Sequence, residues 1–206
     1  MNKLLVIGIG PGNPDYVLPM ASKAINACQL LIGGKRNLDS FPNFQGERLP
    51  LGADLLSAVE VINSRRATEQ VGIILSGDTG FYSMLDFLRR YFQDDELEVI
   101  PGLSSFQYLF GKIKRPWHAT TLMSVHGREA DYLTRLKMGE SMTLLTDRKQ
   151  SPEVIAHRLI QGGLGHLEMI VGENLSYREE RIIRGGPGEI LAHGPYQMAV
   201  VVIINE

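Results

Sequence analysis

The chain has 206 residues, 44% of them hydrophobic and 21% charged, so it can bury a core large enough for one large domain or two small ones. A formal net charge of -2 argues against a dedicated nucleic-acid binder, because such proteins usually carry a basic surplus on one face. The single cysteine, Cys28, excludes an internal disulfide and a cysteine-based zinc site. Its place in an apolar helical pattern favours a core residue over a nucleophile.

The N-terminal residues run directly into a strand-like segment and show no signal-peptide pattern. No apolar stretch approaches the ~18 residues expected of a membrane span. We therefore expect a cytoplasmic protein with no membrane partner.

The first half of the chain alternates strand-like and helical segments. Apolar runs typical of buried strands cover 4–7, 29–32, 71–75 and 97–100, and helical patterns lie between or after them at 19–27, 53–66, 81–91 and 104–110. This alternation predicts an α/β fold with a parallel sheet covered by helices.

The character of the sequence changes near 111–117, a short basic segment that contains Pro116 and suits a linker. We expect an N-terminal lobe over 1–113 and a C-terminal lobe over 114–206. In the second lobe, strand-like runs cover 120–125, 141–145, 167–171, 180–183 and 198–204, with helical patterns at 129–137 and 152–161. Because fewer helices separate the last strands, we expect a mixed sheet with a terminal hairpin.

Glycine-centred turns follow three of the strand-like runs in the first half. They are Gly8-Ile9-Gly10-Pro11-Gly12, Ser76-Gly77-Asp78-Thr79-Gly80-Phe81-Tyr82 and Pro101-Gly102-Leu103-Ser104-Ser105. Glycine lets the backbone approach a ligand closely and take positive φ, so the three turns predict one shared crevice at the carboxyl ends of the strands. The glycine spacing fits neither the dinucleotide fingerprint nor a phosphate loop. A tight strand-to-helix turn without a ligand stays open as an alternative for the first turn.

Polar side chains in these turns are candidates for ligand binding. The carboxylate of Asp78 can accept hydrogen bonds from hydroxyl or ammonium groups, Thr79 adds a donor, and Tyr82 adds a planar face. The alternative for Asp78 is capping of the helix that follows. Ser104 and Ser105 are either crevice-facing residues or an N-cap pair.

Together the three turns resemble those of the tetrapyrrole methylases, the S-adenosylmethionine-dependent enzymes that methylate precorrins. The resemblance runs the length of the chain and continues in Gly172-Glu173-Asn174-Leu175-Ser176. Within the family, Ile32-Gly33-Gly34-Lys35-Arg36 and Leu122-Met123-Ser124-Val125-His126-Gly127 are most similar to the cobalt-precorrin-7 carbon-5 methyltransferases of cobalamin biosynthesis.

The resemblance implies two αβα lobes with the methyl donor in the cleft between them, where S-adenosyl-L-methionine becomes S-adenosyl-L-homocysteine. In the first lobe Gly77, Asp78 and Thr79 would contact the amino-acid or sugar portion of the donor. Residues of the second lobe would close over the adenosine. The implied cofactor-binding residues are Gly77, Asp78, Thr79, Tyr82, Ser104, Ser105, Thr146, Asn174, Leu175 and Tyr196.

The tetrapyrrole side of the implied site includes Pro11 and Gly12 as the cleft floor. A precorrin bears many carboxylates, for which arginine is well suited. Arg36, Arg115 and Arg128 adjoin the candidate turns and are the predicted substrate-binding cations, with surface solubility as the alternative.

Two positions depart from the family pattern. Asn13 stands where family members often have Asp, and Gly77-Asp78-Thr79 stands where many have Gly-Asp-Pro. An electrostatic role at position 13 is therefore in doubt, although asparagine can still cap a helix.

Methyl transfer by in-line displacement needs little acid or base power, and a dry cleft that orients both partners supplies most of the catalysis. A proton must still be moved to or from the macrocycle. His126 is the best-placed candidate for that step, and packing or capping at a strand end is the alternative. No histidine is spaced with another ligand as a metal pair would be, so we expect no protein-bound metal.

The same scaffold could serve another tetrapyrrole position, a diphthine precursor or ribosomal RNA, or a non-catalytic ligand-binding module. The family resemblance also implies a homodimer. A carbon-15 methyltransferase and decarboxylase does not fit in 206 residues, so we expect it as a separate protein of the same pathway.

Overall fold

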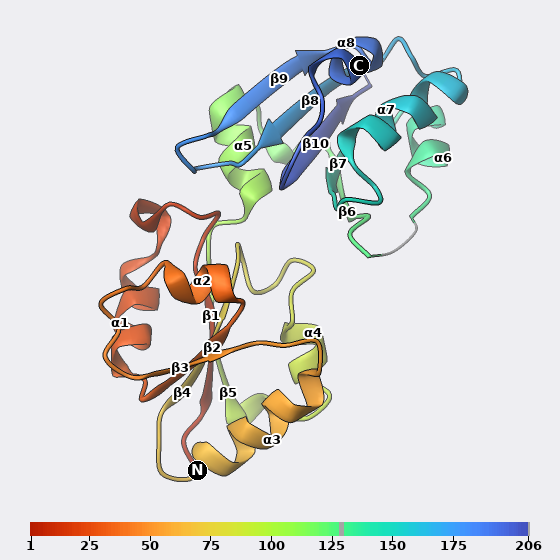
Figure 1. The fold of residues 1–206 in the computed structure, drawn as a ribbon. Helices are drawn as coiled ribbons and strands as arrows, with labels where there is room; N and C mark the ends of the chain where they lie inside the picture. Colours follow the sequence, from red (N-terminus) through yellow and green to blue (C-terminus); the bar gives the residue numbers. More distant parts are fainter. Residues whose placement is uncertain (128–129, 206) are drawn as a thin grey trace. The chain divides into compact units, whose positions relative to one another are not determined.

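A computed structural model describes residues 1–127 and 130–205, which form two compact units, Met1–Ser104 and Ser105–Glu206 (Figure 1). The division falls at the start of α5 (Ser105–Ile113), whereas the sequence placed it at the end of this helix. The reason is packing: Leu109 of α5 lies against Gly172 in the second sheet. The segment expected to begin a linker at residue 111 is still helical.

The first unit holds a parallel sheet, as predicted. Its described strands run in the order β3-β2-β4-β1-β5, and every neighbouring pair is parallel. The strands are β1 (Leu4–Gly8), β2 (Leu30–Gly33), β3 (Glu47–Pro50), β4 (Val71–Leu75) and β5 (Leu97–Ile100). The three inner strands are buried along their whole length, which is typical of a parallel sheet with helices on both faces.

Helices cover both faces of this sheet (Figure 1). Successive residues of β1 separate the two faces: Leu5 packs in a cluster with Ile25 and Leu38, whereas Leu4 packs in a cluster with Ile62. The helices on the Leu5 face are α1 (Pro19–Ala27) and α2 (Lys35–Asp39), and those on the Leu4 face are α3 (Leu55–Arg65) and α4 (Leu85–Leu88).

Cys28 belongs to the cluster on the Leu5 face, which confirms it as a core residue. Its thiol contacts the carbonyl oxygen of Ala24 at 3.2 Å, and burial raises its pKa to about 12.

The second unit holds a mixed sheet, also as predicted. Its described strands run in the order β6-β7-β10-β8-β9; β6 and β7 are parallel, and the other neighbouring pairs are antiparallel. The strands are β6 (Thr121–Ser124), β7 (Met142–Leu145), β8 (Glu168–Glu173), β9 (Arg181–Gly185) and β10 (Ala199–Ile204).

The predicted terminal hairpin is wrong. The hairpin joins β8 to β9, and the last strand, β10, lies between β7 and β8. Burial explains why β10, and not β9, lies inside the sheet. Strand β10 is apolar and almost completely buried, which suits the centre of a sheet, whereas β9 is partly exposed and lies at the edge.

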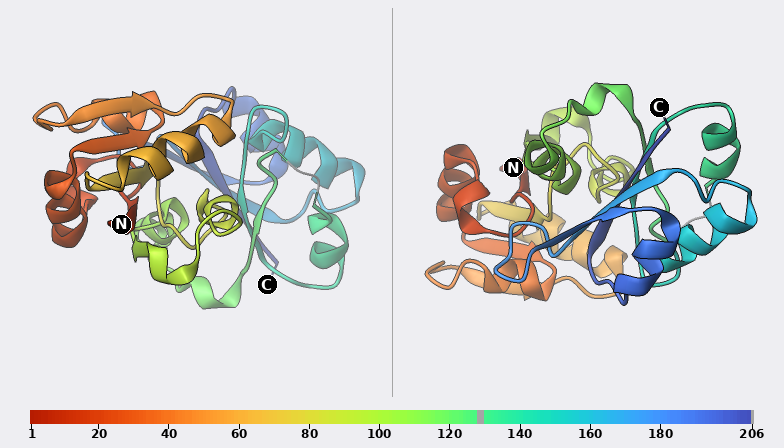
Figure 2. Two further views of the ribbon diagram at one scale, coloured as in Figure 1. Left: turned by 90° about the horizontal axis from the view of Figure 1, so that it is seen from below. Right: turned by 90° about the horizontal axis from the view of Figure 1, so that it is seen from above.

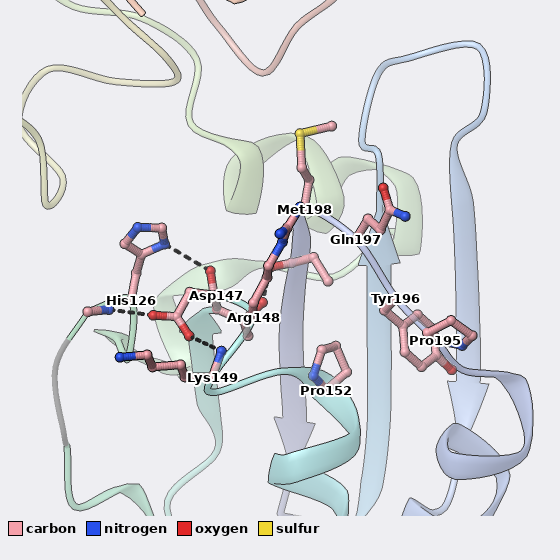
Figure 3. Close-up of a pocket in the computed structure, with 12 residues that line it drawn as sticks. His126, Asp147, Arg148, Lys149, Pro152, Pro195, Tyr196, Gln197 and Met198 are labelled. Carbon is pink, nitrogen blue, oxygen red and sulfur yellow. Dashed lines mark hydrogen bonds between the residues drawn. The ribbon is translucent and has the colours of Figure 1, made fainter. Parts of the chain in front are cut away.

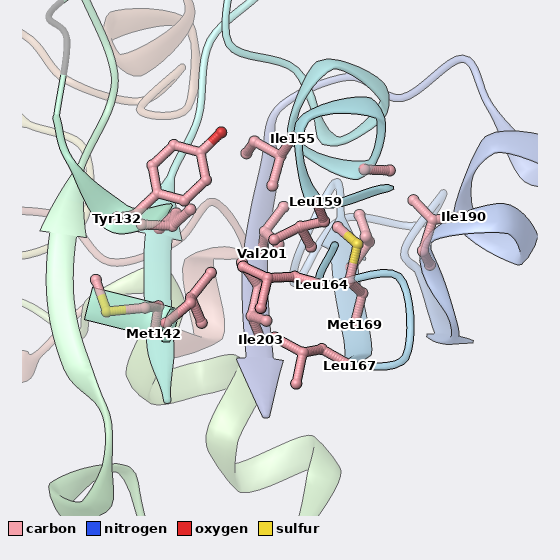
Figure 4. Packing of buried hydrophobic residues seen from close by; sticks show 14 of the residues in the cluster. Tyr132, Met142, Ile155, Leu159, Leu164, Leu167, Met169, Ile190, Val201 and Ile203 are labelled. Atoms are coloured by element: carbon pink, nitrogen blue, oxygen red, sulfur yellow. The ribbon is translucent and has the colours of Figure 1, made fainter. Parts of the chain in front are cut away.

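Helices cover both faces of the second sheet as well (Figure 1; Figure 2). On one face, Tyr132, Ile155 and Ile190 from three helices pack against Val201 and Met169 of the strands (Figure 4). These helices are α6 (Tyr132–Lys137), α7 (Pro152–Gln161) and α8 (Pro187–His193). Helix α5 covers the other face, so both units have the expected αβα layering.

Several elements differ from the expected ones. The helix expected over 81–91 is reduced to α4, because Tyr82 has a φ of 50° and interrupts the pattern. Strand β3 and helices α2 and α8 were not expected, since each is short and β3 is largely exposed. The start of the helix expected over 129–137 lies outside the described residues. Among the described residues, no helix is both long and apolar enough to cross a bilayer.

Candidate functional site

The three glycine turns of the first unit lie side by side, because β4, β1 and β5 are neighbours and run in the same direction. Gly77 donates its N–H to the carbonyl oxygen of Gly10 at 2.7 Å, and Gly10 donates to that of Gly77 at 3.2 Å. A Cβ on Gly102 would lie 2.2 Å from the oxygen of Gly77. Glycine is therefore required here because the turns touch one another through their backbones.

Asp78 links two of these turns. Its Oδ1 accepts the N–H of Gly80 at 2.8 Å, and its Oδ2 accepts the N–H of Gly102 at 3.1 Å. The carboxylate thus caps its own turn and holds the turn after β5. A carboxylate offers about four lone-pair sites, so these two bonds leave acceptor capacity for a ligand.

The other polar candidates in the first unit differ in exposure. Thr79 and Ser104 are 3% and 4% exposed, whereas Tyr82 is 43% exposed. The hydroxyl candidates are therefore enclosed, and the planar face of Tyr82 lies on the surface.

The first turn continues through Pro11, which is buried, and Gly12, which has a φ of 148°. The side chain of Asn13 accepts the N–H of Asp15 at 2.9 Å and caps the short 3₁₀ helix that follows, so the capping role at this position is retained. Arg36 is exposed in α2, directly after the carboxyl end of β2.

In the second unit, the amino end of β10 lies beside the carboxyl ends of β7 and β8. Val200 pairs with Leu145, and Ala199 pairs with Glu173. This register brings the loops that carry Thr146, Asn174 and Tyr196 to one edge of the sheet.

A pocket of about 730 Å³ lies at this edge (Figure 3). Three predicted site residues, His126, Thr146 and Tyr196, line it, whereas Asn174 and Leu175 are not among the lining residues. The full lining is His126, Gly127, Thr146, Asp147, Arg148, Lys149, Pro152, Pro195, Tyr196, Gln197, Met198 and Ala199.

The remaining candidates lie elsewhere. Ser105 begins α5, and Arg115 follows that helix, with its N–H bonded to the oxygen of Phe110 at 3.2 Å. Arg128 lies outside the described residues.

Two of the lining side chains use their hydroxyls inside the protein. Thr146 donates to the carbonyl oxygen of Ala199 at 2.6 Å, which joins the end of β7 to the start of β10. Tyr196 donates to the oxygen of Ile190 at 2.9 Å and is 8% exposed. Both residues can offer a ligand apolar contact and backbone groups.

The wall formed by 195–198 is held by two carboxylates, those of the buried Glu173 and the partly buried Glu153. Glu173, 6% exposed, accepts the N–H of Gln197 at 2.7 Å and the Nε of Arg181 at 2.8 Å. Glu153 accepts the N–H of Tyr196 at 3.0 Å. The pocket wall is thus fixed before any ligand binds.

The opposite wall contains His126 and Asp147 (Figure 3). The Nδ1 of His126 lies 3.2 Å from the carbonyl oxygen of Thr146. Asp147 accepts the N–H of Gly127 at 2.6 Å, and this bond is the main cause that lowers the pKa of the Asp147 carboxyl.

Sequence reasoning missed Asp147, Arg148 and Lys149. Their position directly after the strand-like run 141–145, next to the predicted Thr146, was the signal that could have found them.

The pocket combines apolar groups, among them Met198, Pro152 and the Tyr196 ring, with a few polar groups at one wall. Small-molecule and cofactor sites are commonly built this way. The lining therefore suits the adenosine part of S-adenosylmethionine, the donor that the resemblance implies. Among residues 1–127 and 130–205, no three His, Cys, Asp or Glu side chains are grouped as metal ligands.

Comparison with known proteins agrees with this architecture. The family model for Tetrapyrrole (Corrin/Porphyrin) Methylases matches residues 3–191. A cobalt-precorrin-7 C(5)-methyltransferase of Salmonella typhimurium is 36% identical over 203 residues, which cover 98% of this chain and 99% of that protein. A probable cobalt-precorrin-7 C(5)-methyltransferase of Methanocaldococcus jannaschii is 27% identical, over 97% of this chain and 96% of that protein.

Two solved structures are similar in fold. A cobalt precorrin-4 methyltransferase matches with a TM-score of 0.81 and 19% identity, over 98% of this chain and 94% of that one. A precorrin-6Y methylase from Archaeoglobus fulgidus matches with a TM-score of 0.74 and 19% identity, over 99% of this chain and 98% of that one. Because the family model spans most of the sequence and the Salmonella relative aligns along nearly its whole length, the chain belongs to the tetrapyrrole (corrin/porphyrin) methylases.

Proposed function

We propose that this protein is an S-adenosylmethionine-dependent C-methyltransferase of cobalamin biosynthesis that methylates carbon-5, a meso carbon, of cobalt-precorrin-7. The observation that carries the proposal is the 36% identity with the Salmonella cobalt-precorrin-7 C(5)-methyltransferase along 98% of the chain. One of the two segments that carry the subgroup resemblance ends in His126 and Gly127, which line the pocket of the second unit.

When bound, S-adenosylmethionine supplies a sulfonium methyl group to an electron-rich carbon. In the first unit, Asp78 has acceptor capacity left for the amino-acid or sugar portion, and the turn that carries it is held rigidly by backbone contacts. In the second unit, Thr146 and Tyr196 line a pocket with apolar walls for the adenosine. The complete proposed donor set is Gly77, Asp78, Thr79, Tyr82, Ser104, Ser105, Thr146, Asn174, Leu175 and Tyr196.

The acceptor is bound through its carboxylates and its flat ring. Pro11 and Gly12 present backbone near the carboxyl edge of the first sheet, and Arg36 adds an exposed guanidinium in the same unit. Arg115 and Arg128 complete the proposed set of cations. Arginine suits this task because its planar fork can pair with a carboxylate through two hydrogen bonds.

His126 is the proposed proton acceptor for the methylated carbon. Its side chain is exposed at the wall of the pocket, and an imidazole exchanges protons near neutral pH. Replacement by glutamine, which keeps the side chain polar, should lower kcat by about 10²- to 10⁴-fold if the histidine acts as a general base. The affinity for S-adenosylhomocysteine should stay unchanged.

The deciding experiment incubates the purified protein with methyl-labelled S-adenosylmethionine and a panel of acceptors. The expected result is one labelled methyl group on cobalt-precorrin-7, located at carbon-5 by NMR of the product. Labelling of another precorrin, of a diphthine precursor or of ribosomal RNA would refute the acceptor. Donor binding without transfer to any acceptor would favour a ligand-binding module.

A homodimer and a separate carbon-15 methyltransferase/decarboxylase also belong to this proposal and rest on the family resemblance. We propose a cytoplasmic location as well. A precorrin-6Y C(5,15)-methyltransferase [decarboxylating] from Sinorhizobium sp is matched by this chain over 44% of its length, which supports a second activity outside the shared part. Sedimentation equilibrium should give twice the mass of the chain, and a monomer would refute the dimer.

A further inference from the structure

We infer that Asp147 is a positioning residue that holds His126 in one orientation and one tautomer, with the lone pair on Nε2. The catalytic part of this inference rests on the proposed function, in which His126 accepts a proton. The structural part stands on the hydrogen bonds of the second unit alone.

The carboxylate of Asp147 is occupied by backbone groups. Its Oδ2 accepts the N–H of Gly127 at 2.6 Å, and its Oδ1 accepts that of Lys149 at 2.8 Å (Figure 3). The same Oδ1 also accepts the N–H of Gln150 at 2.7 Å. Two of these bonds close its own loop after β7, and the third reaches the loop after β6. Asp147 therefore joins the two loops next to His126, and it does so without touching the imidazole through a hydrogen bond.

His126 is held on both sides of its α-carbon. Its own N–H donates to the Oγ of Ser124 at 3.2 Å, and Ser124 is only 2% exposed. The next N–H along the chain, that of Gly127, is the one bound by Asp147. The main chain at the histidine is thus fixed by one buried hydroxyl and one carboxylate.

The bond to Asp147 depends on the backbone conformation of Gly127. This glycine has a φ of +66°, and among the described residues, its chain neighbours aside, no heavy atom lies within 4 Å of the position a Cβ would take. A side chain would therefore have room at this position. Glycine is favoured instead because the left-handed backbone conformation costs other residues roughly 1–2 kcal/mol. His126 thus lines the pocket, and the N–H of the next residue, Gly127, is hydrogen-bonded to Asp147.

The ring itself is fixed by Thr146, the neighbour of Asp147 in the same loop. Nδ1 lies 3.2 Å from the Thr146 carbonyl oxygen, which can only accept a hydrogen bond. The neutral ring must therefore carry its proton on Nδ1, which leaves a lone pair on Nε2. In Figure 3 the second ring nitrogen of His126 lies on the side of the imidazole away from the dashed hydrogen bond.

This arrangement suits the last step of the proposed reaction. The new carbon–carbon bond uses an electron pair of the ring carbon, and the bond between sulfur and the methyl group breaks with its pair left on sulfur. The methylated carbon then releases its proton to Nε2, and the electrons of that C–H bond restore the conjugated macrocycle.

Asp147→Asn is the sharpest variant. The carbonyl oxygen of the asparagine can still accept the N–H groups of Lys149 and Gln150, which preserves the loop after β7. Its amide N–H₂ then faces the N–H of Gly127, so the hydrogen bond between the two loops is lost. Asp131→Asn is the matched control, because Asp131 also accepts a backbone N–H in the second unit, that of Thr134 at 3.1 Å, and does not line the pocket.

The first measurement is ¹⁵N NMR of the histidine rings above their titration range, with the His126 signals identified by their loss in His126→Gln. The wild-type protein and Asp131→Asn should show His126 protonated on Nδ1. Asp147→Asn should show a mixture of both tautomers. Protonation on Nε2 in the wild type, or an unchanged Nδ1–H form in Asp147→Asn, would overturn the inference, whatever the acceptor of the enzyme proves to be.

The second measurement is a double-mutant cycle on methyl transfer. Asp147→Asn should lower kcat by about tenfold or more, as expected when a general base is misplaced, with the KM values and donor affinity nearly unchanged. In the His126→Gln background the same change should have almost no further effect on kcat. An equal loss in both backgrounds would overturn the positioning role. Full activity of His126→Gln would instead refute the proposed role of His126 as proton acceptor. The NMR measurement of the tautomer would then test by itself whether Asp147 positions His126.

Discussion

Asp78 and Asp147 make the same kind of contact in the two units. Each carboxylate accepts N–H groups of its own turn and one N–H of a turn that follows a different strand. Charged acceptors form stronger hydrogen bonds with backbone donors than neutral ones do. Both aspartates therefore fix the distance between loops at a sheet edge where candidate site residues lie.

Asp78→Ala should weaken donor binding and lower stability together. The loss of the bonds to Gly80 and Gly102 should cost about 1–2 kcal/mol in the free energy of unfolding. Calorimetric titration with S-adenosylhomocysteine should show a raised Kd. Asp54→Ala is the matched control, because Asp54 caps α3 through Leu56 and Ser57 and should cost similar stability without changing the Kd. Unchanged donor affinity in Asp78→Ala would contradict the proposed contact.

Cys28 should not react with thiol reagents in the native protein. Cys28 is 5% exposed and the pKa of its thiol is raised to about 12. A reagent therefore cannot reach the sulfur easily, and little of the reactive thiolate is present. A titration with a chromogenic disulfide should give almost no reaction under native conditions and one thiol per chain in denaturant. Rapid native labelling would show that the α1 region opens readily.

The turns after β1, β4 and β5 act as one structural element, because their backbones are in direct contact. Gly102→Ala should displace this element, since the new Cβ would lie 2.2 Å from the Gly77 oxygen and 2.8 Å from the carbonyl carbon of Gly8. Backbone atoms cannot yield as a flexible side chain can. We expect a loss of a few kcal/mol in unfolding free energy, in the range of overpacked sites, and a weaker affinity for S-adenosylhomocysteine.

Gly111→Ala provides the contrast for that variant. Gly111 lies inside α5, and apart from its chain neighbours and the backbone of that helix, no heavy atom in the described part of the chain lies within 4 Å of its Cβ position. Alanine should therefore raise the free energy of unfolding by about 0.5–1 kcal/mol through helix propensity. Equal effects of the two substitutions in urea unfolding would refute the explanation by close backbone approach.

The whole protein should lose stability in acid. Hydrogen bonds lower the pKa of several carboxyls in the folded state: the Gly127 N–H acts on Asp147, the Thr134 N–H on Asp131 and the Thr121 hydroxyl on Glu140. The unfolded chain then binds more protons than the folded one as the pH falls through their ordinary pKa values near 4. The stabilisation is complete above these values and is lost as the pH falls through the lowered ones.

Urea unfolding between pH 7 and pH 3 should show this loss, beginning near pH 5. Glu140→Gln removes one of the contributing groups, which also pairs with Arg135, and should flatten the pH dependence. A free energy of unfolding that stays constant down to pH 3 would contradict the assignment.

Part of the fold could be read from local pattern. The runs at 71–75 and 97–100 agree with β4 and β5 in both bounds. For β4 the reason is a continuous apolar run between turn residues, which has few alternatives to a buried strand. The bounds of α1 and α7 agree as well, since each begins at a proline in the first helical turn. Strand β3 lacks such a run, and it exists because β2 offers it a pairing edge.

Some residues of the candidate site could likewise be predicted from the sequence, and others could not. Thr146 and Tyr196 were expected from the resemblance, and His126 from the chemistry of imidazole. The pairing of β6 with β7 and of β7 with β10 brings all three to one pocket. Asp147 was missed because its partner Gly127 is twenty residues away in sequence. The inward direction of the Tyr196 hydroxyl, which is bonded to Ile190, likewise depends on the packing of α8.

The sequence by itself determined the family, the positions of most strands and the turns where glycine is required, because these follow from apolar runs and from local backbone freedom. Only the tertiary structure decided the order of the strands, including the insertion of β10 between β7 and β8, and the joining of separate loops by Asp78 and Asp147. The reason is that strand pairing and hydrogen bonds between loops join groups far apart in the chain. Their geometry is set by the packed sheet and cannot be read from the spacing of residues along the chain.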